Sequence, residues 1–244
     1  MSVLRVAIYT AFVFIATIIL QIYTPATRGY FNLGEAAIYS IAYIASPLVA
    51  GIAGGVGSAL ADLATGYGIF APGTLVIKFS EGYLASYLMK RLSRTGIVRL
   101  RILSIVVAFL VGLLISLVGS ILWSGGVEVT SVPIDLFGYQ LIALSLSITI
   151  SSLVWILIGV IIFATLIYLI LIRGSENISS ALAMSIGGVV MVTGYLLYEY
   201  FVSNPIQGLD PRAAFLEVPV NFGQVIFGIS ISLPVTGFLR RASE

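Results

Sequence analysis

Long apolar runs separated by short polar stretches make up most of this chain. The runs Ile102 to Gly126 and Phe137 to Ile172 carry no charge, and both are longer than the helices of a soluble core. A transmembrane helix needs about 20 apolar residues. The pattern predicts further helices at about Leu4–Thr24, Leu75–Met89, Ile178–Val202 and Val218–Leu239. We therefore expect an all-α, polytopic bundle of transmembrane helices.

The apolar stretch from Glu35 to Leu63 is ambiguous, since its roughly 29 residues are long for one membrane span and short for two. Ser46-Pro47 interrupts it, and proline begins a helix more readily than it continues one. Positive charge favours two helices, because cytoplasmic loops are enriched in Lys and Arg. With one helix, the basic stretch Lys90–Arg101 would lie on the opposite side of the membrane from Arg5.

Two short helices give about eight spans, with both termini in the cytoplasm. Nine of the twelve basic residues are then cytoplasmic: Arg5, Lys90, Arg91, Arg94, Arg99, Arg101, Arg173, Arg240 and Arg241. The outer side carries the segments Ala26–Leu33, Thr65–Thr74 and Ser203–Glu217. The chain is expected to be a multi-pass protein of a cell membrane, embedded in the lipid bilayer.

The run Phe137 to Ile172 would be about 54 Å long if it were helical throughout, which exceeds a hydrocarbon core of about 30 Å. Ser and Thr are dense between Gln140 and Ser152. We therefore expect a break, or a helix that starts at the membrane interface, in this part of the run.

Composition excludes several functional classes. The mean hydropathy is +1.13 and only 9% of residues are charged. With no Cys and no His, the chain lacks disulfides, thiolate and imidazole metal ligands, and the commonest general base. Neither lysine, Lys78 or Lys90, lies in a phosphate-binding Gly-Lys-Ser/Thr loop. We expect no enzyme activity, no metal, no cofactor and no nucleic-acid partner.

Five ionisable residues lie inside or beside apolar segments: Glu35, Asp62, Lys78, Glu81 and Glu199. A charge in a membrane is costly, so it usually pairs or faces a polar cavity. Lys78 and Glu81 share one helix face, being three residues apart, and Asp62 is a second candidate partner for Lys78. Two interpretations stay open, a polar cluster that contacts a ligand or a structural ion pair that joins two helices.

The outer segment Arg28 to Glu35 is a second candidate site. Glycines flank a Tyr30-Phe31-Asn32 group, and aromatic rings with an amide suit a planar heterocycle. The alternative is an ordinary interfacial loop with belt aromatics. Glu35 opens a helix, where an anion is favoured, so simple capping would also explain it.

Two further residues lie near outer helix ends, Glu199 beside several tyrosines and Asn221 after Pro219. They either face one outer cavity or belong to the interface, where Glu199 would snorkel. Separately, small residues repeat every fourth position at Gly51, Gly55 and Ala59, and at Ala7 and Ala11. Such stripes permit close helix approach, and we expect packing within the chain at Gly51–Ala59.

Several of these motifs together resemble the riboflavin-transporter-type S components of energy-coupling factor (ECF) transporters. The first block comprises Gly29-Tyr30-Phe31-Asn32-Leu33-Gly34-Glu35-Ala36, Pro47, the glycine-rich stretch Gly51 to Asp62, Gly66-Tyr67, Ala71-Pro72 and Ile77-Lys78. The second comprises Gly187-Gly188, Gly194-Tyr195, Glu199-Tyr200 and Leu216 to Asn221. The resemblance covers about Ser2–Met89 and Ile178–Arg241.

The resemblance implies a membrane-embedded substrate-binding subunit of an ABC-type micronutrient importer. Such a subunit captures a vitamin or related heterocyclic small molecule outside and hands it over with a transmembrane T component and ABC-type ATPases. S components usually have six helices. The chain is thus expected to form one membrane domain, 1–244, with core helices at about 4–89 and 178–239 and an inserted helix pair at about 102–172.

The resemblance and the residue patterns together give one candidate site. The predicted substrate-binding residues are Tyr30, Asn32, Asp62, Tyr67, Lys78, Glu81, Glu199 and Asn221. The resemblance implies that Ala7 and Ala11 contact the T component. Two other functions stay open, a self-sufficient proton-coupled secondary transporter with Asp62, Lys78, Glu81 and Glu199 as its relay, and a membrane scaffold held by structural ion pairs.

Overall fold

A computed structural model describes residues 2–25, 27–122, 124–130, 135–136, 139–140, 145–172 and 175–243. Ala26 and Phe137, which begin two of the segments discussed above, lie outside the described residues, as does the basic residue Arg173.

Helices dominate the described part of the chain, as the apolar runs predict. Eight have eleven or more residues: α1 (Val3–Ile19), α2 (Gly34–Ile44), α3 (Pro47–Ala64), α4 (Ala71–Leu92), α5 (Ile97–Leu122), α6 (Ser152–Ile172), α7 (Ser175–Tyr198) and α9 (Ala214–Ser243). A π-helical turn (Glu199–Ser203), α8 (Asn204–Ile206) and a 3-10 turn (Pro211–Ala213) join α7 to α9. The all-α bundle is confirmed, and so is the division of the stretch Glu35–Leu63 into two helices at Pro47.

Among the described residues, four segments are long and apolar enough to cross a membrane: Pro47–Ala64, Ile97–Ile121, Asn177–Ile206 and Pro211–Leu239. Val3–Ile19 and Ser152–Tyr168 are shorter apolar helices. These helices support a multi-pass membrane protein. The arrangement of a six-helix core plus two inserted helices, and the side on which the termini lie, stay predictions.

The chain folds as two compact units, Met1–Leu100 with Gly174–Glu244, and Arg101–Arg173. In the second unit α6 begins at Ser152, as expected from the polar stretch before it. Strands precede that helix, and this was not predicted: β3 (Gly125–Thr130) pairs with β6 (Ser145–Ile150), and β4 (Asp135–Leu136) with β5 (Tyr139–Gln140). The alternation Ser-Leu-Ser-Ile-Thr-Ile in β6 is the period-two signal of a strand.

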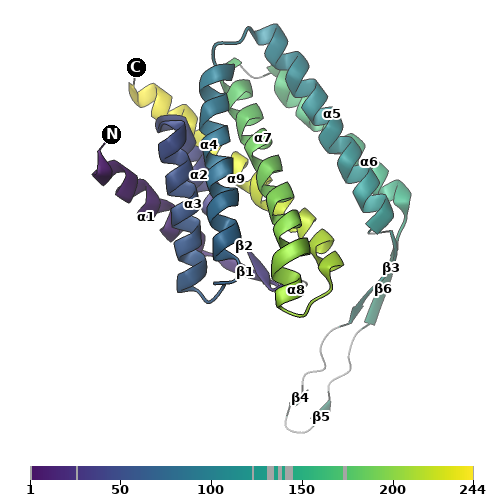
Figure 1. The fold of residues 1–244 in the computed structure, drawn as a ribbon. Coiled ribbons are helices and arrows are strands. Elements are labelled where there is room, and N and C mark those ends of the chain that lie inside the picture. Colours follow the sequence, from purple (N-terminus) through teal and green to yellow (C-terminus); the bar gives the residue numbers. More distant parts are fainter. Residues whose placement is uncertain are drawn as a thin grey trace. The chain divides into compact units, whose positions relative to one another are not determined.

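The first unit is a helix bundle with a short hairpin at one end (Figure 1). Helix α3 packs between α1 and α4, α4 also packs on α7, and α9 packs on both α2 and α7. The two termini lie at one end of this unit, whereas the hairpin and α8 lie at the other. Its core is formed by small and aliphatic side chains from α1 to α4 and α7, among them Val13, Ile38 and Met184.

The hairpin corrects the predicted extent of the first helix, which was expected to run to Thr24. Helix α1 ends at Ile19, and β1 (Gln21–Thr24) pairs antiparallel with β2 (Gly29–Asn32). Ile, Tyr and Thr favour strands as well as apolar helices, and a partner strand satisfies their backbone groups once the chain turns back. Arg28, in the turn, takes a positive φ of 58°.

Glycines permit the close contact between α3 and α4. A Cβ at Gly55 would lie 2.5 Å from the carbonyl oxygen of Leu75, and one at Gly51 would lie 3.0 Å from the ring of Phe79. The small-residue stripe on α3 therefore serves packing within the chain, as predicted. Because α3 and α4 both carry polar residues toward the hairpin end, their spacing also sets the spacing of those residues.

Candidate functional site

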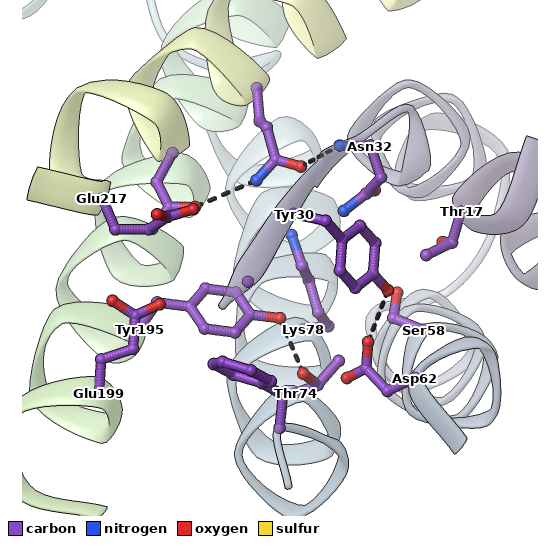
Figure 2. A pocket seen from close by; sticks show the side chains of 14 residues that line it. Thr17, Tyr30, Asn32, Ser58, Asp62, Thr74, Lys78, Tyr195, Glu199 and Glu217 are labelled. Atoms are coloured by element: carbon purple, nitrogen blue, oxygen red, sulfur yellow. Dashed lines mark hydrogen bonds between the residues drawn. The ribbon is translucent and has the colours of Figure 1, made fainter. Parts of the chain in front are cut away.

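A polar cavity lies at the hairpin end of the first unit (Figure 2). Its lining residues come from β2, the α3–α4 turn and six helical elements, namely α1, α3, α4, α7, the π-helical turn and α9. They are Thr17, Gly29, Tyr30, Asn32, Ser58, Asp62, Phe70, Thr74, Lys78, Tyr195, Glu199, Glu217, Asn221 and Gln224. Its volume is about 30 Å³, which is room for about two water molecules. The side chains thus converge closely, and a larger guest needs the walls to separate.

Tyr30 joins the hairpin to α3 across this cavity. Its hydroxyl donates to Oδ1 of Asp62 at 2.5 Å, and its ring packs against Tyr67 with centroids 4.4 Å apart. Burial, together with the charge of Asp62, raises the pKa of Tyr30, so the phenol keeps its proton and acts as a donor. Oδ2 of Asp62 has no hydrogen-bond partner in the described part of the chain.

Lys78 lies at the floor of the cavity in a buried ion-pair network. Its Nζ pairs with Glu35 and, at 3.2 Å, with Oε2 of Glu81. Tyr39 donates to Oε1 of Glu81 at 2.7 Å. The three charged side chains are at most 2% exposed. One cation is therefore shared by two buried carboxylates within the bundle.

This network corrects two expectations. Lys78 pairs with Glu81 as predicted, but its second partner is Glu35 and not Asp62. The reason is tertiary, because α2 packs against α4 and brings the first turn of α2 to Lys78. Capping alone is therefore the wrong interpretation of Glu35, which is buried in the ion pair as well as placed at a helix start.

Helix α9 holds the hairpin over the cavity. Glu217 accepts hydrogen bonds from the hydroxyls of Thr24 (3.0 Å) and Thr27 (2.8 Å). The backbone N–H of Asn32 donates to Gln224 at 2.7 Å. These bonds join two segments almost 200 residues apart in sequence, so the closed position of the hairpin depends on α9.

Glu199 reaches the cavity from the start of a π-helical turn, Glu199–Ser203. Such turns are rare and frequently occur at functional sites. The side chain is 2% exposed, and within the described residues its Oε2 has no hydrogen-bond partner. Tyr195, one turn earlier, shares a hydrogen bond of 2.9 Å with Thr74 of α4.

Six of the eight predicted site residues line the cavity: Tyr30, Asn32, Asp62, Lys78, Glu199 and Asn221. The other two, Tyr67 and Glu81, do not line the cavity but contact residues that do. Tyr67 packs against the ring of Tyr30. Glu81 is fully buried, and its two oxygens are used by Tyr39 and Lys78. Ala7 and Ala11 lie exposed on α1, away from the cavity lining.

Sequence reasoning missed several lining residues, namely Thr17, Ser58, Thr74, Tyr195, Glu217 and Gln224. Hydroxyl residues are common inside apolar helices, where they bond to the preceding turn, as Thr17 does to the carbonyl of Val13. The sequence did contain a signal for Gln224, because it follows Asn221 by three residues and therefore shares the helix face of that predicted site residue. The two side chains are hydrogen-bonded at 3.1 Å.

Replacing Tyr30 with phenylalanine is expected to lower the free energy of unfolding by about 1–3 kcal/mol, because a buried carboxylate loses its hydrogen-bond donor. Phenylalanine keeps the ring contact with Tyr67. Thermal unfolding in mild detergent measures the change. In a background of Asp62→Asn the same substitution should have a clearly smaller effect, and equal effects in both backgrounds would contradict the assigned bond.

Two comparisons relate the chain to known proteins. A protein from Pyrococcus woesei, described as an uncharacterized protein in a gap 3' region, is 44% identical over 82 residues. That match covers 34% of this chain and 55% of the relative, so the chain spans about half the length of the relative that it matches.

The family described as ECF-type riboflavin transporter, S component, matches residues 1–170, well over half of the 244 residues. The matched range includes α5 and most of α6. The family match therefore does not distinguish 102–172, the predicted inserted helix pair, from the rest of the matched chain. This family comprises binding components of transporters and not enzymes, which agrees with the expectation of no enzyme activity. The chain belongs to the family of S components of ECF-type riboflavin transporters.

Proposed function

We propose that this chain captures a vitamin or related small molecule outside the cell, as the substrate-binding subunit of an ECF-type importer. The observation that carries the proposal is the convergence of buried polar side chains from the hairpin and six helical elements on one cavity within an apolar bundle. Buried polar groups in a membrane protein are costly and usually functional. Membership of the S-component family supplies the transport role.

The residues that line the cavity are the proposed ligand contacts. Tyr30 and Tyr195 offer aromatic faces, and Asn32 and Asn221 offer amides that both donate and accept. Since the cavity is small, a vitamin-sized ligand requires the hairpin to move away from α9. Tyr67 and Glu81 then act by supporting Tyr30 and Lys78.

The opposite end of the first unit is the proposed cytoplasmic end. The termini lie there, far from the hairpin (Figure 1). The basic residues Lys90 and Arg91 lie in the last turn of α4, and Arg94 follows that helix. This orientation satisfies the positive-inside rule and places the cavity outside, in the plasma membrane of a prokaryote. The small, exposed Ala7 and Ala11 on α1 are the proposed contact for a transmembrane T component, which works with ABC-type ATPases.

The proposal is tested by reconstitution in liposomes. Small molecules that co-purify with the protein in mild detergent are identified by mass spectrometry and offered as radiolabelled ligand. We expect binding by this chain alone, and sustained uptake only when the T component, the ATPases and ATP are present. Replacing Ala7 and Ala11 with tryptophan should leave binding unchanged and abolish uptake.

The alternative function gives the opposite result in the same experiment. A proton-coupled carrier would take up ligand without partners, and a protonophore would collapse that uptake. Absence of any bound small molecule, together with absence of uptake under both conditions, would favour the scaffold interpretation.

A further inference from the structure

The walls of the cavity carry more acidic than basic side chains. Three lining residues are acidic, Asp62, Glu199 and Glu217, and one is basic, Lys78. The charge of Lys78 is already matched, because it pairs with Glu35 and Glu81, neither of which lines the cavity. Among the described residues, no ion pair therefore joins a cation to any of the three lining carboxylates.

The described part of the chain offers these carboxylates no other positive partner. Both ion pairs found there involve Lys78. Arg28 and Arg212, the basic residues nearest in sequence to the hairpin turn and to Glu217, are exposed at the surface. Neither makes an ion pair with a lining carboxylate within the described residues.

Two of the carboxylates also have one oxygen that receives no hydrogen bond. Asp62 and Glu199 are each 2% exposed, and one oxygen of each, Oδ2 and Oε2, has no partner in the described part of the chain. Glu217, in contrast, is satisfied by Thr24 and Thr27. A buried polar atom without a hydrogen-bond partner costs about 1–3 kcal/mol, and more in a charged group, so two such oxygens at one cavity indicate groups that a ligand satisfies.

The two carboxylates lie on different sides of the cavity. Figure 2 shows Glu199 on one side with Tyr195, and Asp62 on the other with Tyr30. Both tyrosine rings line the cavity, and Nζ of Lys78 already lies 5.6 Å from the ring centroid of Tyr195. Aromatic faces at that distance attract cations. The site thus combines two acceptors with ring faces that tolerate positive charge.

We propose, on the basis of the proposed binding function, that the ligand is an organic cation: a heterocycle or other planar body that carries a protonated amine, an amidine or a positively charged ring nitrogen. Its N–H donors and positive charge satisfy Asp62 and Glu199. Riboflavin, which is uncharged at neutral pH, would leave both carboxylates without a cation. A bare metal ion does not fit, since the described residues include no group of three metal-ligating side chains.

The test measures binding to the purified full chain by isothermal titration with probes of three charge classes. Thiamine, pyridoxamine and agmatine are the cations, riboflavin and nicotinamide the neutral compounds, and biotin and folate the anions. Any compound that co-purifies is added to its class. We expect binding only among the cations, weakened about 10-fold to 100-fold by Asp62→Asn or Glu199→Gln.

The control variant is Asp210→Asn, which removes one exposed carboxylate outside the cavity lining and should leave the affinity unchanged. The amide variants keep side-chain shape, and their folding is checked by monodisperse elution in detergent. Binding of a neutral or anionic compound with equal affinity in the amide variants overturns the cationic ligand and leaves the binding function standing. Absence of binding in all three classes counts against the binding function itself, and the cationic ligand falls with it.

Discussion

Replacing Lys78 with methionine is expected to lower the free energy of unfolding by about 3–5 kcal/mol, because it leaves buried carboxylates without their cation. Glu35 and Glu81 are at most 1% exposed and share Lys78 as their ion-pair partner. Methionine fills a volume similar to that of lysine, so the decrease in stability reflects the missing positive charge and not a change in packing. Thermal and denaturant unfolding in mild detergent measure it.

The same network supplies the control. Adding Glu35→Gln and Glu81→Gln to Lys78→Met removes the orphaned charges, and most of the lost stability should return. Lys90→Met is the matched single substitution, since Lys90 donates to the backbone carbonyl of Ala45 and makes no ion pair within the described residues. If Lys78→Met and Lys90→Met lower stability equally, the buried network is not the stabilising feature that we infer.

Replacing Gly55 with valine is expected to separate α3 from α4 and to destabilise the protein by about 2–3 kcal/mol, the range of severe overpacking. The first added atom alone would meet the backbone oxygen of Leu75 at 2.5 Å, and backbone cannot rotate away as a side chain can. Asp62 and Lys78 lie on the two separated helices, so ligand affinity should fall along with stability.

Gly237→Val is the control for Gly55→Val. Gly237 also lies inside an apolar helix, α9, but no heavy atom would lie within 4 Å of a Cβ there. Its unfolding temperature and ligand affinity should stay close to those of the unsubstituted chain. A Gly55→Val protein that unfolds at the same temperature and binds with the same affinity would show that α3 and α4 are not as close as described.

The fold was largely predictable because membrane helices are specified by local composition. Apolar length alone predicted α5, and Pro47 together with the distribution of basic residues predicted the separation of α2 from α3. Strands were missed at β1 and β6, where Ile and Thr, with Tyr in β1, suit either an apolar helix or a strand. The choice between them depends on a partner strand, which a single segment does not reveal.

The candidate site was predictable only in part, and charge explains which part. Asp62, Lys78 and Glu199 are conspicuous because ionisable residues are rare in apolar sequence. Thr17 and Ser58 resemble ordinary helix residues until the fold brings them to the cavity. The partner of Lys78 also depended on the fold, since Glu35 is 43 residues away and reaches it only through the packing of α2 on α4.

The bonds that α9 makes to the hairpin have a kinetic consequence. Opening breaks the bonds of Thr24 and Thr27 to Glu217 and of Asn32 to Gln224. At about 1–2 kcal/mol for each bond, the open form is populated at roughly one molecule in 10² to 10⁴. Association should be slower than the diffusional encounter by that factor. A molecule once enclosed would then leave slowly, so that a scarce nutrient remains bound between the arrivals of a transport partner.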